Sequence, residues 1–244
     1  MKATKIIFLL LLTISLFVVS CNDDDTLPDG TTTTPRAVTM ENDAREKGIL
    51  WEHNDTINIY FLNGTASQKD SVKKYVTDWD NIINLTFSYK EHAKNAEVRI
   101  YFDPTTSSGW SKIGKKACLS VVDTTRPTMA LYKNIATKPK SLVFDKGTIR
   151  HEFGHMLGLI HEQLRPDSGI AWKDSLNIRG GGEQILEQDL EHYVRSEYDP
   201  LSIMHYSVRN TETTDSSSLP GYIAHGELSA KDIEFIKSLY PPQD

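Results

Sequence analysis

The chain has 244 residues, of which 39% are hydrophobic and 25% are charged, and its formal net charge is −6. This size and composition allow one globular domain of about 200 residues together with appendages. The acidic balance and the lack of a basic stripe in the sequence exclude nucleic acid as an expected partner.

The first 20 residues have the pattern of an export signal. Lys2 and Lys5 supply positive charge, and residues 6–19 form an apolar run that is too short for a typical membrane span. The run ends in Val-Val-Ser-Cys, which resembles a bacterial lipobox, and this resemblance implies that Cys21 is lipidated and becomes the first mature residue. We therefore expect a lipoprotein signal peptide over residues 1–20 and an anchor in the bacterial outer membrane or at the cell surface. The alternative is an ordinary secretory signal, so the protein is exported in either case.

Residues 21–47 are expected to form a disordered tether. They include an acidic run at positions 23–25 and a threonine run at positions 31–34, with very few apolar side chains that could form a core. The acidic run is either a sorting signal or a solvated spacer. The globular domain is expected over residues 48–244.

The domain begins with an alternation of strands and a helix. Residues 56–61 alternate apolar and polar side chains, which predicts a strand. A helix is predicted over residues 67–83, because apolar residues such as Val72 and Trp79 recur there at helical spacing. Two more strands are predicted at residues 85–89 and 97–102.

The next segment should supply the edge of the sheet. Residues 109–114 are predicted to be a loop, and residues 117–122 and 128–132 are two strand candidates. We expect one of them, by position the second, to be an antiparallel edge strand, whose unpaired backbone groups can bind an extended peptide. Cys118 is most simply a small buried residue in the first candidate, and a thiolate that inhibits a metal site is the alternative. An acylated Cys21 would leave Cys118 without a disulfide partner.

The most informative pattern is His-Glu-x-x-His-x-x-Gly-x-x-His, formed by His151, Glu152, His155, Gly158 and His161. On a helix the first two histidines lie one turn apart, so both imidazoles project from the same face and can share a zinc ion. Glu152 is rotated away and suits contact with the water on the metal rather than ligation. A left-handed glycine would end the helix and turn the chain back, so that the third histidine completes the ligand set. Three ligands with an open fourth position are typical of a catalytic zinc.

The helix with this motif is expected to begin near residues 146–148. A core helix that carries histidines without a metal is the simpler alternative, with Met156, Leu157 and their neighbours as its apolar face. Five specified positions match by chance in about 10⁻⁴ of chains of this length, so the metal interpretation is preferred.

The motif resembles the zinc-binding signature of the metzincin metalloproteases, and Glu162 directly after the third histidine resembles the astacin branch. Arg165 and Asp167 are similar to the family's continuation Arg-x-Asp-Arg-Asp, although Ser168 and Gly169 replace its last pair. The resemblance implies an α+β, zincin-like catalytic domain. Such a domain has a twisted, mostly parallel sheet with an antiparallel edge strand, an active-site helix, a Met-turn and a C-terminal helix.

Two downstream segments extend the resemblance. Residues 202–206, Ser-Ile-Met-His-Tyr, resemble the astacin Met-turn, which implies that Met204 lies beneath the zinc and that Tyr206 is a fifth zinc ligand. A tyrosine packed in the core is the alternative for Tyr206. Ser229 and Asp232 are placed as a near capping box that begins a last helix, similar to the C-terminal helix of astacins.

Together these features predict a zinc-dependent endopeptidase. One zinc ion, held by His151, His155 and His161, would activate a water, and Glu152 would be the general base. The resemblance implies that Tyr206 leaves the metal when substrate binds and donates a hydrogen bond to the developing oxyanion. No other cofactor is expected.

Within the enzymes, the alternative is a metzincin closer to the matrixins or to another bacterial branch, with the same chemistry and a different cleft. The non-enzymatic alternative is a catalytically inactive lipoprotein that binds other proteins at the cell surface on a metzincin fold. It would require a ligand or the base to be missing, and all are present in the sequence. The expected partner is therefore a protein or peptide substrate. We expect a monomer that touches the membrane only through the lipid anchor at Cys21.

Glu162 raises a separate question. In mature astacins this glutamate pairs with a buried amino terminus, but an acylated Cys21 would offer no such amine. Either the chain is cut between Arg36 and Arg45, or Glu162 pairs with another cation. We favour the second hypothesis, because the preceding segment is too short for a folded prodomain.

Overall fold

A computed structural model describes residues 45, 47–132, 134, 142–175, 178, 193–221 and 226–242. For residues 142–144 only the backbone is described. All of these residues belong to the compact unit Thr34–Asp244. The expected signal peptide, most of the expected tether and Cys21 lie outside the described residues, so those expectations stay predictions. None of the helices that the structure describes is long and apolar enough to cross a membrane.

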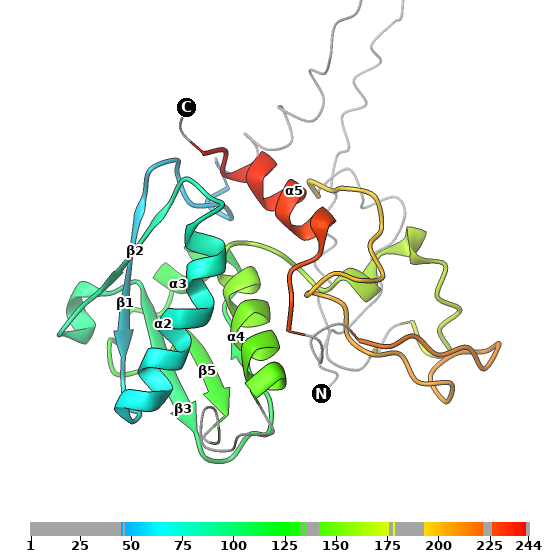
Figure 1. The fold of residues 1–244 in the computed structure, drawn as a ribbon, viewed down its shortest axis with the longest axis horizontal. Coiled ribbons are helices and arrows are strands. Elements are labelled where there is room, and N and C mark those ends of the chain that lie inside the picture. Colours follow the sequence, from blue (N-terminus) through cyan, green and yellow to red (C-terminus); the bar gives the residue numbers. More distant parts are fainter. Residues whose placement is uncertain are drawn as a thin grey trace, which may run out of the picture. The chain divides into compact units, whose positions relative to one another are not determined.

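The described strands form one five-stranded sheet in the order β2-β1-β3-β5-β4 (Figure 1). The first four are parallel, and β4 pairs antiparallel with β5 at the edge. The strands are β1 Thr56–Phe61, β2 Thr86–Tyr89, β3 Val98–Asp103, β4 Trp110–Ser111 and β5 Met129–Tyr132. The predicted mostly parallel sheet with an antiparallel edge strand is confirmed.

The prediction of which segment forms that edge is wrong. Strand β5 lies inside the sheet between β3 and β4, and all four of its residues are buried. Its uninterrupted apolar run is typical of a strand that is covered on both faces. The edge strand is β4, from the segment expected to be a loop, with Trp110 opposite Ala130 and Ser111 opposite Met129.

Residues 117–122 do not form the other expected strand. The chain forms the helix α3 Gly114–Leu119, and Gly114 begins it at φ 71° with no room for a Cβ beside the Ile49 carbonyl. Of the apolar run, Leu119 and Val122 are 50% and 88% exposed, so it has no continuous buried face. Cys118 is buried as expected, but on a helix.

Helix α2 Ala66–Asp80 crosses one face of the sheet. It begins at a capping box between Thr65 and Gln68, and it ends three residues before the predicted position. Val72, Val76 and Trp79 are buried along one side, as their helical spacing predicts. Figure 1 shows α2 beside α4, the helix that carries the first two histidines.

Helix α4 Leu142–Met156 begins four residues before the start predicted near residues 146–148, and Gly147 is buried within it. Its end is held by two buried side chains. The indole Nε1 of Trp51 donates to the Met156 carbonyl at 2.9 Å, and the Tyr240 hydroxyl donates to the Leu157 carbonyl at 2.7 Å. These bonds satisfy carbonyls that a helix end leaves without an intrahelical partner.

The remaining helices are short, apart from the C-terminal one. Helix α5 Ala230–Leu239 begins at a complete capping box formed by Ser229 and Asp232, so the predicted last helix is confirmed. The 3₁₀ helices among the described residues are η1 Ala93–Asn95, η3 Glu162–Leu164 and η4 Pro166–Ser168.

Candidate metal centre

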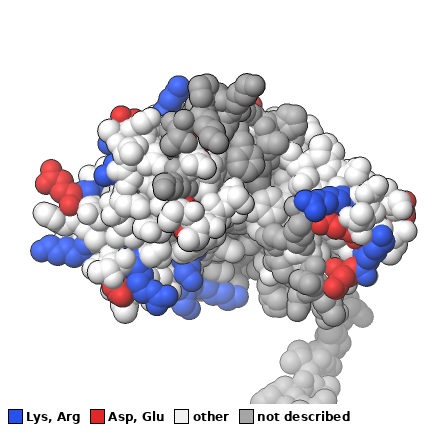
Figure 2. Space-filling model, turned by 90° about the horizontal axis from the view of Figure 1, so that it is seen from below, with Lys and Arg blue, Asp and Glu red and all other residues white. Residues whose placement is uncertain are grey.

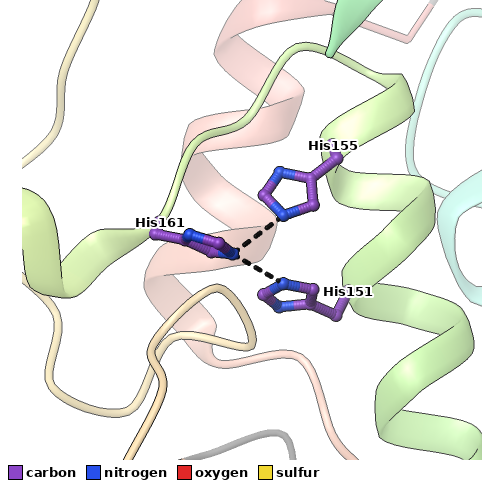
Figure 3. A group of neighbouring side chains, drawn as sticks. All are labelled: His151, His155 and His161. Carbon is purple, nitrogen blue, oxygen red and sulfur yellow. Dashed lines mark hydrogen bonds between the residues drawn. The ribbon is translucent and has the colours of Figure 1, made fainter. Parts of the chain in front are cut away.

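Three histidines from two segments converge on one point. His151 and His155 lie one turn apart on α4, and Gly158, at φ 104°, turns the chain back so that His161 faces them (Figure 3). The Nε2 atom of His161 lies 3.1 Å from Nε2 of His151 and 3.0 Å from Nε2 of His155. The predicted convergence is therefore found, and among the described residues these three form a group that could hold a metal ion.

The backbone orients two of these rings. The Nδ1 atom of His151 lies 2.8 Å from the Ile203 carbonyl oxygen, and Nδ1 of His155 lies 2.8 Å from the Leu159 carbonyl oxygen. A carbonyl oxygen only accepts, so each Nδ1 carries the proton and each Nε2 presents a lone pair. This is the arrangement that metal-binding histidines adopt.

Burial keeps the three imidazoles neutral at physiological pH. It lowers the pKa of His151 well below its usual value, and it lowers the pKa of His155 to about 4 and that of His161 to about 3. The desolvation of the charged form is the largest cause for each ring. Neutral imidazole is the form that binds a metal ion.

The donor set fits a zinc ion. The Nε2 lone pairs of His151 and His155 both point at Nε2 of His161, which lies within 3.1 Å of each. Nitrogen atoms that face one another in this way are favourable only with a proton or a cation between the rings. Ligands at about 2.0–2.1 Å from a tetrahedral zinc would lie about 3.3–3.4 Å from one another, close to the spacing found here. Three imidazoles without a thiolate are a ligand set of catalytic zinc sites.

Glu152 is buried beside the three histidines. The residue is 2% exposed, and its Oε2 atom has no hydrogen-bond partner. Burial raises the pKa of Glu152 to about 8. The backbone of Gly109, next to β4, comes so close that a Cβ built there would lie 2.5 Å from Oε1 of Glu152. The carboxylate is thus held in a narrow space between α4 and the loop before the edge strand.

The segment that resembles a Met-turn passes next to the same helix. Met204 is 2% exposed, and a Cβ built on Gly154 of α4 would lie 2.5 Å from its sulfur atom. Tyr206 stacks on the His151 ring with centroids 5.0 Å apart and lies tilted against His161 at 4.5 Å. The structure therefore places Tyr206 beside two of the histidine rings and Met204 against Gly154 of α4.

Gln163 is part of the site, and the sequence reasoning missed it. The residue is 1% exposed, and its Oε1 atom accepts the Tyr206 N–H at 3.0 Å. The neighbouring Glu162 N–H donates to the Met204 carbonyl at 3.1 Å. The segment after His161 therefore fixes the segment that carries Tyr206. The only sequence feature that could have pointed to Gln163 is its position two residues after the third histidine.

The structure shows a cation beside Glu162. The guanidinium of Arg165 lies 3.3 Å from its Oε1 atom, and the Asp199 N–H donates to the same atom at 2.8 Å. Burial raises the pKa of Glu162 to about 7, although Arg165 acts in the opposite direction. Arg165 also makes two bonds to Asp167, at 2.8 and 2.9 Å, so Glu162 shares this cation.

Cys118 does not belong to the metal centre. It is buried in α3, and burial raises the pKa of its thiol to about 12, which disfavours the thiolate that binds metals. The described group of metal ligands contains histidines only.

The family model for Astacin, which describes a peptidase family, matches residues 43–240. The chain belongs to the astacin family. The family match, together with the mostly parallel sheet and the helices described above, confirms the predicted zincin-like α+β fold. The astacin family is zinc-dependent.

Curated relatives come from animals. The chain is 32% identical to Protein SpAN of Strongylocentrotus purpuratus over 161 residues, which cover 59% of this chain and 26% of that protein. It is 27% identical to the zinc metalloproteinase dpy-31 of Caenorhabditis elegans over 201 residues, which cover 75% of this chain and 31% of that protein. This astacin-family chain thus spans about a quarter to a third of the length of these relatives.

Two solved structures match most of this chain. Myroilysin is 28% identical with a TM-score of 0.64, and the match covers 80% of this chain and 97% of that one. The hatching enzyme zinc-protease HCE-1 of the medaka fish Oryzias latipes has a TM-score of 0.51 over 80% of this chain and 96% of its own. At 19% identity, this second likeness shows the fold alone.

Proposed function

We propose that this astacin-family protein is a zinc-dependent endopeptidase that hydrolyses peptide bonds of proteins. The observation that carries the proposal is the convergence of the three Nε2 atoms next to a buried glutamate without a partner on Oε2. His151, His155 and His161 would hold the ion, with Tyr206 as a further ligand. The bound zinc would supply Lewis acidity toward the substrate carbonyl and toward water.

Glu152 has the properties of a group that moves protons. Burial raises the pKa of Glu152, so its carboxylate form is a stronger base than that of an exposed glutamate, and its protonated form can return the proton. We assign it to take a proton from the attacking water and to deliver it to the amine that leaves. Its narrow surroundings, with Gly109 on one side, limit the positions that the carboxylate can adopt.

The edge strand is the proposed binding place of the substrate backbone. Strand β4 pairs with β5 along one edge, and it lies against α4. An extended peptide can add to such an edge through backbone hydrogen bonds. Trp110, 40% exposed on this strand, offers an apolar surface to a substrate side chain.

Figure 2 shows acidic and basic side chains together on the face that it draws, and several of them lie next to one another. The expectation that nucleic acid is not a partner stays a prediction, as does the expected monomer.

Casein cleavage by the full-length protein tests the proposed function. We expect cleavage that a zinc chelator stops and that added zinc restores. Zinc binding without cleavage of casein or of a peptide library would favour the alternative, an inactive protein that binds others at the cell surface.

Changing Tyr206 to phenylalanine should lower kcat by about 10²–10³-fold, with little change in KM, because a hydrogen-bond donor to the oxyanion is lost. The phenylalanine ring preserves the stacking on His151 and His161. Steady-state kinetics on a fluorogenic peptide measure the effect, and Tyr198→Phe is a matched control, since its hydroxyl contacts His205. Equal kcat in Tyr206→Phe and the unmodified enzyme would refute this role.

We also propose that the active protein is exported and anchored through an acylated Cys21, on the strength of the signal-peptide pattern and of the Arg165 cation near Glu162. Intact-mass spectrometry of active protein purified from membranes should show a chain that begins at acylated Cys21. A homogeneous new terminus between Arg36 and Arg45 would instead support pairing of Glu162 with a freed amine. An unmodified chain that begins near Cys21 would refute the anchor.

A further inference from the structure

The carboxylate of Asp232 has more partners than a helix cap requires. As part of the capping box of α5, its Oδ2 atom accepts the Ser229 N–H at 2.9 Å. The same atom also accepts the Ile203 N–H at 2.8 Å, and Oδ1 accepts the Ser202 hydroxyl at 2.6 Å. Asp232 is 7% exposed, and its bonds to Ser202 and Ile203 are buried. Two of the three reach the segment that contains Met204.

These bonds fix both peptide groups around Ile203. The N–H of the first peptide group is bound directly by Asp232. In the second, the Met204 N–H donates to the Ser202 hydroxyl at 3.0 Å, and that hydroxyl is itself bound to Asp232. The carbonyl of this second peptide group is that of Ile203. Its direction is therefore set from two sides by one carboxylate.

The Ile203 carbonyl is the acceptor for Nδ1 of His151, at 2.8 Å. This bond holds the proton on Nδ1 and turns Nε2 toward His155 and His161. A loose Ile203 carbonyl would free the His151 ring to rotate and to change its tautomer. Outer partners of this kind contribute strongly to metal affinity.

We propose that Asp232 is a positioning residue of the metal centre, which acts through the Ile203 peptide groups to hold the His151 ring in its ligating orientation. The proposal rests on the zinc site proposed above. It gives α5 a function beyond covering the core, since the first turn of this helix fixes the orientation of a ligand on α4.

Three full-length variants separate this role from helix capping. Asp232→Ala removes all three hydrogen bonds of the carboxylate. Asp232→Asn keeps one oxygen for the two N–H groups and an NH₂ group that can donate to the Ser202 hydroxyl. Ser229→Ala removes the hydroxyl that accepts the Asp232 N–H and donates to Asp199, and it leaves the Asp232 carboxylate in place. The readouts are the zinc Kd from chelator competition, the visible spectrum of the Co²⁺-loaded protein and the thermal midpoint of the metal-free protein.

We expect Asp232→Ala to weaken zinc binding by about 10–100-fold and to change the Co²⁺ spectrum. Asp232→Asn should recover most of the affinity and the spectrum. Ser229→Ala should lower the thermal midpoint and leave the zinc Kd and the spectrum unchanged. Unchanged zinc affinity in Asp232→Ala, no recovery in Asp232→Asn, or equal losses in Ser229→Ala and Asp232→Ala would each overturn the proposal.

If Asp232→Ala does not fold, the proposal is tested by hydrogen exchange of the Ile203 amide in the unmodified metal-free protein. The Ile203 amide should then be strongly protected, and rapid exchange would overturn the proposal. Unmodified protein that binds no zinc at all would instead refute the proposed function, so the two failures are distinguishable.

Discussion

Changing Glu152 to alanine should lower kcat/KM for peptide hydrolysis by about 10²–10⁴-fold, the contribution typical of a general base. Glu152 is next to His151 on α4, but it is not among the three converging side chains. Zinc affinity should therefore stay close to that of the unmodified protein. Fluorogenic peptide kinetics and a zinc titration of the same preparation measure both quantities.

Glu152→Gln is the matched control, because the amide keeps the shape of the side chain and cannot accept a proton as a carboxylate does. It should be as inactive as Glu152→Ala. Turnover that is unchanged in either variant would refute the assignment of the base. Loss of zinc together with activity would show that Glu152 contributes to metal binding.

Changing Trp79 to alanine should lower the free energy of unfolding by about 3–5 kcal/mol, as expected for a large aromatic residue removed from a core. Trp79 on α2 is completely buried, and its Nε1 atom donates to the Arg150 carbonyl at 3.1 Å. Arg150 directly precedes the first histidine, so the indole holds α4 against α2 at the metal centre. Chemical denaturation of the metal-free protein measures the change.

Trp79→Phe separates packing from the hydrogen bond. Phenylalanine fills most of the space but offers no N–H, so it should destabilise the fold clearly less than alanine does. A loss below about 1 kcal/mol in Trp79→Ala would contradict the packing described for α2 and α4, because surface substitutions typically cause changes of that size or smaller.

The centre of the site could be predicted because its information is local. The spacing of His151 and His155 follows from the helical period, and Gly158 supplies the left-handed turn that brings His161 back to them. The capping box at Ser229 likewise depends on residues three positions apart. The histidine spacing, the glycine turn and the capping box each depend on residues close together in the chain, and the structure has all three at the predicted positions.

The wrong predictions concern the edge strand and residues 117–122, where contacts between distant parts of the chain determine the secondary structure. Residues 128–132 resemble an edge strand by position, but β4 covers the outer side of β5. Strand β4 has only two residues, too few to show an alternating pattern. Residues 117–122 have β-forming side chains, yet the conformation of Gly114 against Ile49 directs the chain into a helix.

The partners of Glu162 and Asp232 could not be derived from spacing alone. Arg165 is only three residues from Glu162, but its ion pair depends on the 3₁₀ turn between them. Asp232 and Ile203 are 29 residues apart, and their hydrogen bond exists because α5 begins beside the Met204 segment. Such contacts follow from the assembled fold.

The measurement that tests the central claim most directly is the metal content of the purified full-length protein. After dialysis against trace zinc, elemental mass spectrometry should find one zinc ion per chain in the unmodified protein and none retained in a variant with His151, His155 and His161 all changed to alanine. A folded unmodified protein that retains no zinc, or a histidine variant that retains as much, would contradict the claim that these three imidazoles form a metal centre.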